Sequence, residues 1–156
     1  MSRFTLGIEV GAVVLGKTFQ RMPLHCTLIH WFRSDREPSE IERCVIEAAM
    51  TQPKTVLRSL GPSLFGPDKN IPVHILEKNR ELEDLHMNIF NALNDLLVTF
   101  THPAYVGPEY KPHISDSEGA YFFTGSEMLA ERIYLVEAIT NNKPPLKVVR
   151  SIIPLP

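Results

Sequence analysis

Two short segments of this chain, each a histidine followed two positions later by a hydroxyl residue, place the strongest constraint on its fold. The first holds His25 and Thr27, and the second holds His113 and Ser115. Both lie in stretches whose residue pattern predicts a β-strand, where side chains at positions i and i+2 point to the same face. Each segment therefore presents one imidazole beside one hydroxyl. If the fold brings the two strands together, the four side chains form a pocket that can bind a phosphate and move protons on both sides of it.

Further strands and two helices surround these segments. Strands are predicted over residues 4–10, 24–32, 56–60, 71–77, 110–116, 121–123, 131–139 and 147–153, with a short strand or an irregular return over 13–19. A helix is predicted to begin at Ser39, because Ser39 and Glu42 have the spacing of a capping box, and to end at Pro53. A second helix, over residues 80–98, carries a continuous apolar stripe. Residues 61–68, rich in glycine and proline, predict a loop.

The predicted order is strands, helix, strands, helix, strands, with one histidine segment in each half of the chain. A length of 156 residues fits one domain with a proper core, and no linker-like composition divides it. We therefore expect a single α+β domain over residues 1–156, in which two lobes face each other.

Charge and cysteine content limit the partners and the setting. The chain has 16 basic and 18 acidic residues and no basic run, whereas proteins that bind long duplex nucleic acid usually carry a basic stripe. This favours small or end-bound substrates over long polymers. We also expect a monomer. No apolar run approaches the length of a membrane span and no leader pattern opens the sequence, so we expect a cytoplasmic protein without membrane contact. Cys26 and Cys44 form neither a metal spacing nor a disulfide framework, and we expect buried, reduced thiols.

The histidine segments suit phosphodiester chemistry. That chemistry needs a base for the attacking hydroxyl or water, an acid for the leaving oxygen, and donors for the phosphoryl oxygens. An imidazole can serve as base or acid near neutral pH, and the hydroxyls of Thr27 and Ser115 can donate hydrogen bonds to the phosphate. No metal is required, and the sequence contains no HExxH or cysteine-rich ligand set, so we expect neither a metal nor a cofactor.

With these motifs the chain resembles the 2H phosphoesterase superfamily, the LigT-like proteins, whose signature is two His-x-Thr/Ser segments. The similarity extends to residues 64–66, 73–76, 82–86, 110–115 and 151–155, and so covers most of the chain. It implies an α+β bilobal fold with two antiparallel-sheet lobes, each with a helix packed outside, and an active site in the central cleft. It also implies that His25 and His113 are the catalytic pair and that Thr27 and Ser115 hold the phosphate. Asp116 departs from the pattern, since the family has an apolar residue there; on a strand it should point away from His113.

Several other residues are candidates for substrate binding. Trp31 shares the predicted face of His25 and can stack on a base, although it can equally be part of the core or the cleft wall. Phe65, in the predicted loop, can fold over the cleft or anchor the loop. Tyr110 and Lys111 precede the second motif, and Lys111 shares the face of His113, where it can meet a phosphate or remain in solvent. His30 is predicted on the opposite face of its strand, and His86 is predicted to be structural.

The favoured interpretation is a metal-independent phosphodiesterase that hydrolyses a small nucleotide substrate by two-histidine acid–base catalysis. Substrates that the resemblance implies are a 2′-5′ or 3′-5′ linked oligonucleotide, a cyclic oligonucleotide messenger, or a 2′,3′-cyclic phosphate at an RNA end. Two alternatives stay open: a module that binds and sequesters a nucleotide without turnover, and an RNA 2′-5′ end ligase.

Overall fold

The computed structural model describes residues 1–115 and 122–156. Its strands are β1 (Ser2–Glu9), β2 (Thr18–Phe19), β3 (His25–Ser34), β4 (Val56–Phe65), β5 (Ile71–Leu76), β6 (Thr99–Phe100), β7 (His113–Ser115), β8 (Glu127–Leu129), β9 (Arg132–Ile139) and β10 (Leu146–Pro154). Its helices are α1 (Pro38–Ala49) and α2 (Arg80–Asp95), followed by the short 3-10 turns η1 (Pro103–Tyr105) and η2 (Gly107–Glu109). Asp116 and Tyr121, both named in the predictions, lie outside the described residues. Residues 122 and 123 are not in a strand, so that part of the predicted strand is wrong.

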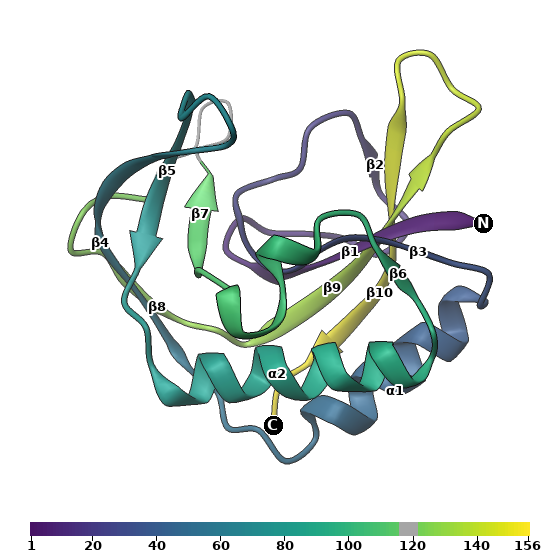
Figure 1. Cartoon of the computed structure of the whole chain (residues 1–156), viewed down its shortest axis with the longest axis horizontal. Helices are drawn as coiled ribbons and strands as arrows, with labels where there is room; N and C mark the ends of the chain where they lie inside the picture. The colour runs from purple at the N-terminus through teal and green to yellow at the C-terminus, as the bar shows by residue number, and fades with distance from the viewer. Residues whose placement is uncertain (116–121) are drawn as a thin grey trace.

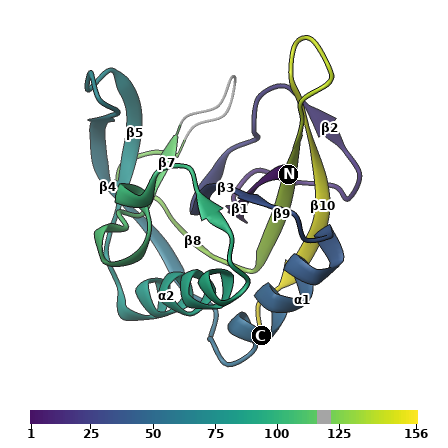
Figure 2. The same ribbon diagram turned by 45° about the vertical axis from the view of Figure 1, so that its right-hand side comes forward.

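The described strands form one open antiparallel sheet rather than two separate ones. Its order is β2-β10-β9-β1-β3-β7-β5-β4-β8, with β6 paired to β3. The halves join where β3 pairs with β7, through a ladder that contains Cys26 opposite Ile114. From this junction the two halves diverge, and both helices lie at the closed end (Figures 1 and 2). The α+β fold with two facing halves is therefore confirmed, with the addition that the two lobes share one sheet.

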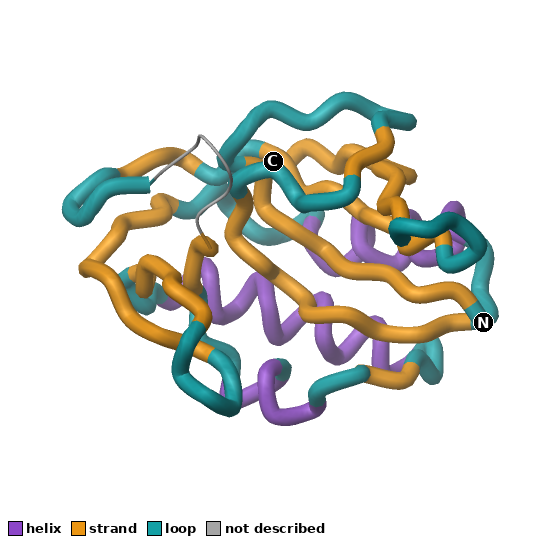
Figure 3. Tube along the Cα trace, turned by 90° about the horizontal axis from the view of Figure 1, so that it is seen from above, coloured by secondary structure: helices purple, strands orange, loops and turns teal. Residues whose placement is uncertain are grey.

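Both helices pack on the same side of the sheet (Figure 3). Alternate residues of β1, including Phe4 and Leu6, join apolar residues of both helices in one buried core. Helix α2 begins at Arg80 because the side chain of Asn79 accepts a hydrogen bond from the Leu82 amide at 2.8 Å. No helix within the described ranges has the length and apolar composition needed to cross a bilayer.

Helix α1 begins earlier than predicted. Glu37, not Ser39, precedes its first turn, and Pro38 takes the first helical position, where the missing amide proton costs nothing. The Glu37 amide donates to the Glu40 carboxylate at 3.1 Å. A capping box does begin the helix, as predicted, but it is formed by Glu37 and Glu40, two residues before the predicted pair Ser39 and Glu42.

Strand β3 contains two irregularities that decide which of its side chains face the helices. Leu28 and Ile29 together lie opposite Leu6, and both are fully buried in the core. His30 and Trp31 together lie opposite Thr5 of β1, on the other face of the sheet. The prediction that His30 points away from the His25 face is therefore wrong, because simple alternation cannot account for extra residues in a strand.

Candidate active site

The backbone just before each motif fixes the orientation and tautomer of its histidine. Nδ1 of His25 lies 2.8 Å from the carbonyl oxygen of Pro23, and Nδ1 of His113 lies 2.8 Å from that of Lys111. A carbonyl oxygen can only accept, so both Nδ1 atoms carry a proton and donate it. In the neutral ring the Nε2 atom then has a free lone pair. At His25 this Nε2 lies 3.2 Å from the hydroxyl oxygen of Thr27, which is placed to donate to it.

The sheet brings the two motifs side by side. Because β3 and β7 are antiparallel and Cys26 pairs with Ile114, the next residues on each side of this pair are also opposite one another. His25 is then opposite Ser115, and Thr27 is opposite His113. Directly opposed side chains lie on the same face with Cβ atoms about 4.5–5.5 Å apart, while Cys26 and Ile114 are buried in the core. The predicted set of two histidines and two hydroxyls is therefore assembled on one face.

Burial keeps both histidines neutral at physiological pH. It lowers the pKa of His25 from 6.5 to about 4; the hydrogen bond to Pro23 opposes this, and the charge of the nearby His113 adds to it. Burial also lowers the pKa of His113, against the effect of its hydrogen bond to Lys111. Each imidazole is thus a proton acceptor at pH 7 in the absence of an anion, and the proximity of the pair disfavours protonation of both at once.

Phe65 and Tyr134 form walls around the two histidines. The ring of Phe65 lies 4.5 Å from that of His113, centroid to centroid, and the ring of Tyr134 meets that of His25 edge-on at 6.3 Å. Phe65 is the last residue of β4, so the prediction that it lies in a loop is wrong. Tyr134 is fully buried, and its hydroxyl has no hydrogen-bond partner among the described residues.

Gly7 of β1 leaves room for the His25 and Tyr134 rings. A Cβ atom at this position would lie 3.1 Å from Cε1 of Tyr134 and 3.2 Å from Cδ2 of His25. Neither Tyr134 nor Gly7 was predicted as a site residue. A glycine inside an otherwise alternating strand is a sequence signal for such a close approach, whereas nothing in the sequence marks Tyr134.

Tyr110 is buried, and its side chain contacts the first motif strand. Only 7% of the residue is exposed, and its hydroxyl donates to the Thr27 carbonyl oxygen at 2.8 Å. Its ring stacks on that of His86, with centroids 3.9 Å apart. His86 is buried as predicted, and it links Leu28 to Gly107: Nδ1 donates to the Leu28 carbonyl, and Nε2 accepts from the Gly107 amide, both at 2.8 Å. Tyr110 and His86 thus tie β3 to the segment that leads into β7.

The remaining candidates occupy the periphery of the site. Trp31 faces the same side as His25, as predicted, and carries the Arg3 guanidinium 5.0 Å above its ring. It also packs against a smaller cluster of buried residues, separate from the main core, which consists of Val13, Tyr134, Val136 and Val149. Lys111 is exposed, and its carbonyl oxygen rather than its ammonium contacts His113. Among the described residues no group of three or more His, Cys, Asp or Glu side chains is arranged to hold a metal ion.

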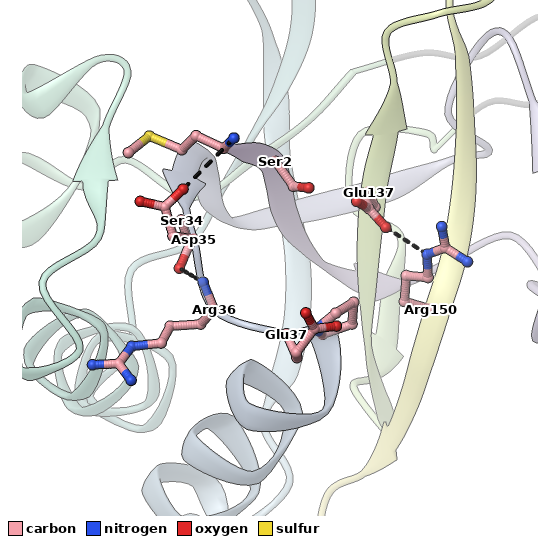
Figure 4. A pocket seen from close by; sticks show the side chains of 9 residues that line it. Ser2, Ser34, Asp35, Arg36, Glu37, Glu137 and Arg150 are labelled. Carbon is pink, nitrogen blue, oxygen red and sulfur yellow. Dashed lines mark hydrogen bonds and ion pairs between the residues drawn. The ribbon is translucent and has the colours of Figure 1, made fainter.

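A separate cavity of about 450 Å³ lies at the start of α1, away from the histidines (Figure 4). Two ion pairs lie in its lining: the N-terminal amine is 3.6 Å from Asp35, and Arg150 is 2.6 Å from Glu137. None of the predicted site residues lines it. The cavity therefore contributes nothing to the chemistry of the histidine pair.

Comparison with solved structures matches this fold over nearly the whole chain. The protein TT0787 of Thermus thermophilus superposes with a TM-score of 0.67 at 16% identity, covering 98% of this chain and 97% of its own. E. coli LigT complexed with 3′-AMP superposes with a TM-score of 0.67 at 13% identity, covering 99% and 98%. The chain has the LigT fold. A structure described only as a phosphoesterase also matches, with a TM-score of 0.63 at 12% identity and 99% coverage of both chains.

The LigT fold agrees with the resemblance found in the sequence. No protein-family model matches the chain, and no curated protein matches it by sequence. The LigT-like likeness therefore rests on the three-dimensional fold together with the two histidine motifs. E. coli LigT has also been crystallised with ATP, NADP⁺ and phosphate.

Proposed function

We propose that this chain is a metal-independent phosphodiesterase of the 2H type, which hydrolyses a nucleotide phosphodiester by two-histidine acid–base catalysis. The observation that carries the proposal is the pair of histidines whose Nδ1 atoms are both committed to backbone carbonyls. This leaves both Nε2 atoms on the same face of the sheet, available for proton transfer. Two such groups flanking one phosphorus supply a base and an acid for one displacement.

The roles of the four side chains follow from their protonation. His25, with a pKa of about 4, is neutral over most of the pH range and accepts a proton from the attacking water. His113 in its protonated form donates to the leaving oxygen, and the bound phosphate anion favours that form. When the phosphate binds, the Thr27 hydroxyl leaves Nε2 of His25, and it and the Ser115 hydroxyl donate to the non-bridging oxygens, where negative charge concentrates in the transition state. The water oxygen bonds to phosphorus as the bond between phosphorus and the ribose oxygen breaks. His25 takes one proton from the water, and His113 gives one proton to the leaving oxygen.

The nucleotide class of substrate is supported by the likeness to LigT. That protein has been crystallised with 3′-AMP, ATP and NADP⁺, which share a ribose next to a phosphate. The direct test is a panel that contains a nucleoside 2′,3′-cyclic phosphate, a 2′-5′ linked oligoadenylate, a 3′-5′ linked dinucleotide and a cyclic dinucleotide. We expect hydrolysis of at least one of them in the presence of EDTA. A joined product from RNA fragments with 2′,3′-cyclic ends, without hydrolysis, would instead identify a ligase, and recovery of every compound unchanged would contradict the proposal.

The pH dependence of kcat/KM should reflect both lowered pKa values. The base must be neutral, which requires a pH above about 4 for His25. The acid must be protonated, which requires a pH below the pKa of His113, itself lowered from 6.5. We therefore expect a bell-shaped profile with its maximum on the acid side of pH 6.5 and a tenfold decline per pH unit on the alkaline limb. Circular dichroism at each pH separates loss of fold from loss of activity, and a maximum above pH 7.5 would contradict this assignment.

Replacing Phe65 with alanine should move the alkaline limb. The aromatic ring lies against His113 and contributes to its burial, so its removal admits water and raises the pKa of His113 toward 6.5. We expect kcat/KM at pH 5 to fall by about 3- to 30-fold, because positioning is lost, and the alkaline limb to shift to higher pH. The Phe65→Leu variant keeps an apolar cover and should retain most of the original profile. An unchanged limb in Phe65→Ala would show that the ring does not shield His113.

A further inference from the structure

A cluster of aromatic rings lies beyond Thr27 and His113, on the face of the sheet that carries the two histidines. The ring of His30 is 5.0 Å from that of His102 and 5.4 Å from that of Tyr105, and the latter two are 5.4 Å apart. His30 comes from β3, while His102 and Tyr105 come from the segment that follows β6. The amide of Thr101 donates to the Trp31 carbonyl at 2.9 Å, which ties that segment to β3.

The irregularity in β3 is what creates this cluster. His30 and Trp31 together oppose Thr5, so two consecutive aromatic side chains emerge on the face that carries His25. A regular strand would have turned one of them into the core. The cluster remains partly open, since Tyr105 is 45% exposed and His102 is also exposed. Exposed, preformed aromatic faces of this kind bind nucleobases by stacking.

A cation that has no ion pair among the described residues lies beside the rings. The guanidinium of Arg3 lies over the Trp31 ring, and its Nε has no hydrogen-bond partner among the residues that the structure describes. The ion pairs identified in the described ranges do not include Arg3. Burial lowers the pKa of Lys147 and the charge of Arg3 lowers it further, so a second cation is near. Guanidinium groups bind phosphate through paired N–H donors.

The cluster is close to the reaction centre. His30 is three residues beyond Thr27 on β3, which corresponds to about 10 Å along a strand. Burial is the main cause of the lowered pKa of His30, and the charges of His102, His113 and Arg3 add to it, so these groups are near. A phosphate held by Thr27 and His113 would therefore place its neighbouring nucleotide over the rings.

We propose that His30, His102, Tyr105 and Arg3 form a subsite for a second nucleotide, in which the rings stack on its base and Arg3 binds its phosphate. The proposal rests on the proposed function and narrows it. The preferred substrates are linear or cyclic oligonucleotides with at least two bases and two phosphates, rather than a nucleoside 2′,3′-cyclic phosphate.

Equilibrium binding tests the subsite separately from catalysis. The probes are 2′-5′ linked pApA, which has two bases and two phosphates, and 3′-AMP, which has one of each. Trp31, the single tryptophan of the chain, lies under Arg3, so its fluorescence reports occupation of the subsite. We expect the wild-type chain to bind pApA at least tenfold more tightly than 3′-AMP.

Variants of the subsite should lower the affinity for only one probe. Tyr105→Ala should weaken pApA binding by about 5- to 150-fold, which is the range for loss of one base-stacking contact. Arg3→Gln should weaken it at least fivefold, while both variants bind 3′-AMP within twofold of wild type. Tyr105→Phe, which keeps the ring, and Arg80→Gln, at an exposed arginine on α2, are the controls and should match wild type for both probes.

The results separate this inference from the proposed function. Equal affinity of the wild type for the two probes, parallel weakening of both by Tyr105→Ala, or no binding of pApA would overturn the subsite, even if a nucleoside 2′,3′-cyclic phosphate is hydrolysed. Selective pApA binding that Tyr105→Ala and Arg3→Gln abolish, without hydrolysis of any phosphodiester, would support the subsite and contradict the phosphodiesterase.

Discussion

Replacing either His25 or His113 with alanine is expected to lower kcat for a ribose-linked phosphodiester by about 10²- to 10⁴-fold, the usual contribution of one acid or base. Each imidazole is oriented by a backbone carbonyl, and neither Thr27 nor Ser115 can take over proton transfer near neutral pH. The double variant should lose little more than the worse single variant, because the two groups act in one displacement. Initial rates with the substrate found in the panel, at pH 5 and pH 7, measure this.

The controls address folding and metal dependence. Glu81→Ala, at an exposed position in the first turn of α2, should retain wild-type turnover, and all variants should show the wild-type far-UV spectrum. EDTA should leave the rates unchanged. A residual rate above one tenth in either histidine variant, or a rate that falls in EDTA and returns with a divalent cation, would overturn the two-histidine mechanism.

The titration of His25 offers a second measurement on the same variants. The charge of His113 is one of the causes that lower the pKa of His25 to about 4. His113→Ala removes that charge and also opens the site to water, and both changes favour the charged imidazole. The pKa of His25, followed by NMR, should therefore rise toward 6.5 in His113→Ala. No change would mean that the two rings are not coupled.

The sequence was sufficient to predict which four side chains share one face of the sheet, because their placement depends on local spacing. His25 with Thr27, and His113 with Ser115, share a face in any regular strand, and the family resemblance supplied the pairing of β3 with β7. The same reasoning failed four residues later. Two extra residues in β3 put Ile29 in the core and His30 on the face that carries His25. Such irregularities leave no periodic signal in a sequence.

Residues 61–65 show a second limit of local reasoning. Gly61 and Pro62 predict a loop, yet β4 continues through them to Phe65. Proline is tolerated where a strand lacks a neighbour on one side, and β8 pairs with β4 only over residues 56–58. Because the strand continues, the Phe65 ring reaches His113. The edge position that permits this is a property of the assembled sheet, so the residues alone could not reveal it.

The contacts of Tyr110 likewise could be found only in three dimensions. Its proximity to His113 in sequence predicted a binding role, whereas its hydroxyl hydrogen-bonds to the Thr27 carbonyl. Three successive carbonyl oxygens of β3, from Thr27 to Ile29, accept from side chains, those of Tyr110, His86 and Thr5 respectively. These side chains replace the partners that a regular ladder would supply. The segment with the irregularities is therefore held by residues far away in sequence.

His86→Phe should accordingly cause a large loss of stability. Phenylalanine can keep the stacking on Tyr110, but it leaves the Leu28 carbonyl and the Gly107 amide without their partners at a site that is 1% exposed. A buried group left unsatisfied costs about 1–3 kcal/mol, so we expect the free energy of unfolding to fall by about 2–6 kcal/mol at pH 8. Denaturant unfolding followed by Trp31 fluorescence measures it. His102→Phe, at an exposed histidine, should change stability by no more than about 0.5 kcal/mol.

The pH dependence of stability distinguishes a lost hydrogen-bonding histidine from poor packing. The pKa of His86 is about 4 in the folded chain, lowered mainly by burial, against an ordinary value of 6.5. Between these values the unfolded chain binds more protons than the folded one, so stability falls as the pH drops from 6.5 to 4. The pKa values of His25 and His30 are lowered as well, and their contribution to the pH dependence of stability remains in His86→Phe. As the pH falls from 6.5 to 4, the free energy of unfolding should therefore decrease less steeply in the variant than in the wild type. The two slopes should differ by at most about 1.4 kcal/mol per pH unit. Equal slopes with equal midpoints would show that His86 does not link Leu28 to Gly107 as a neutral, doubly hydrogen-bonded ring.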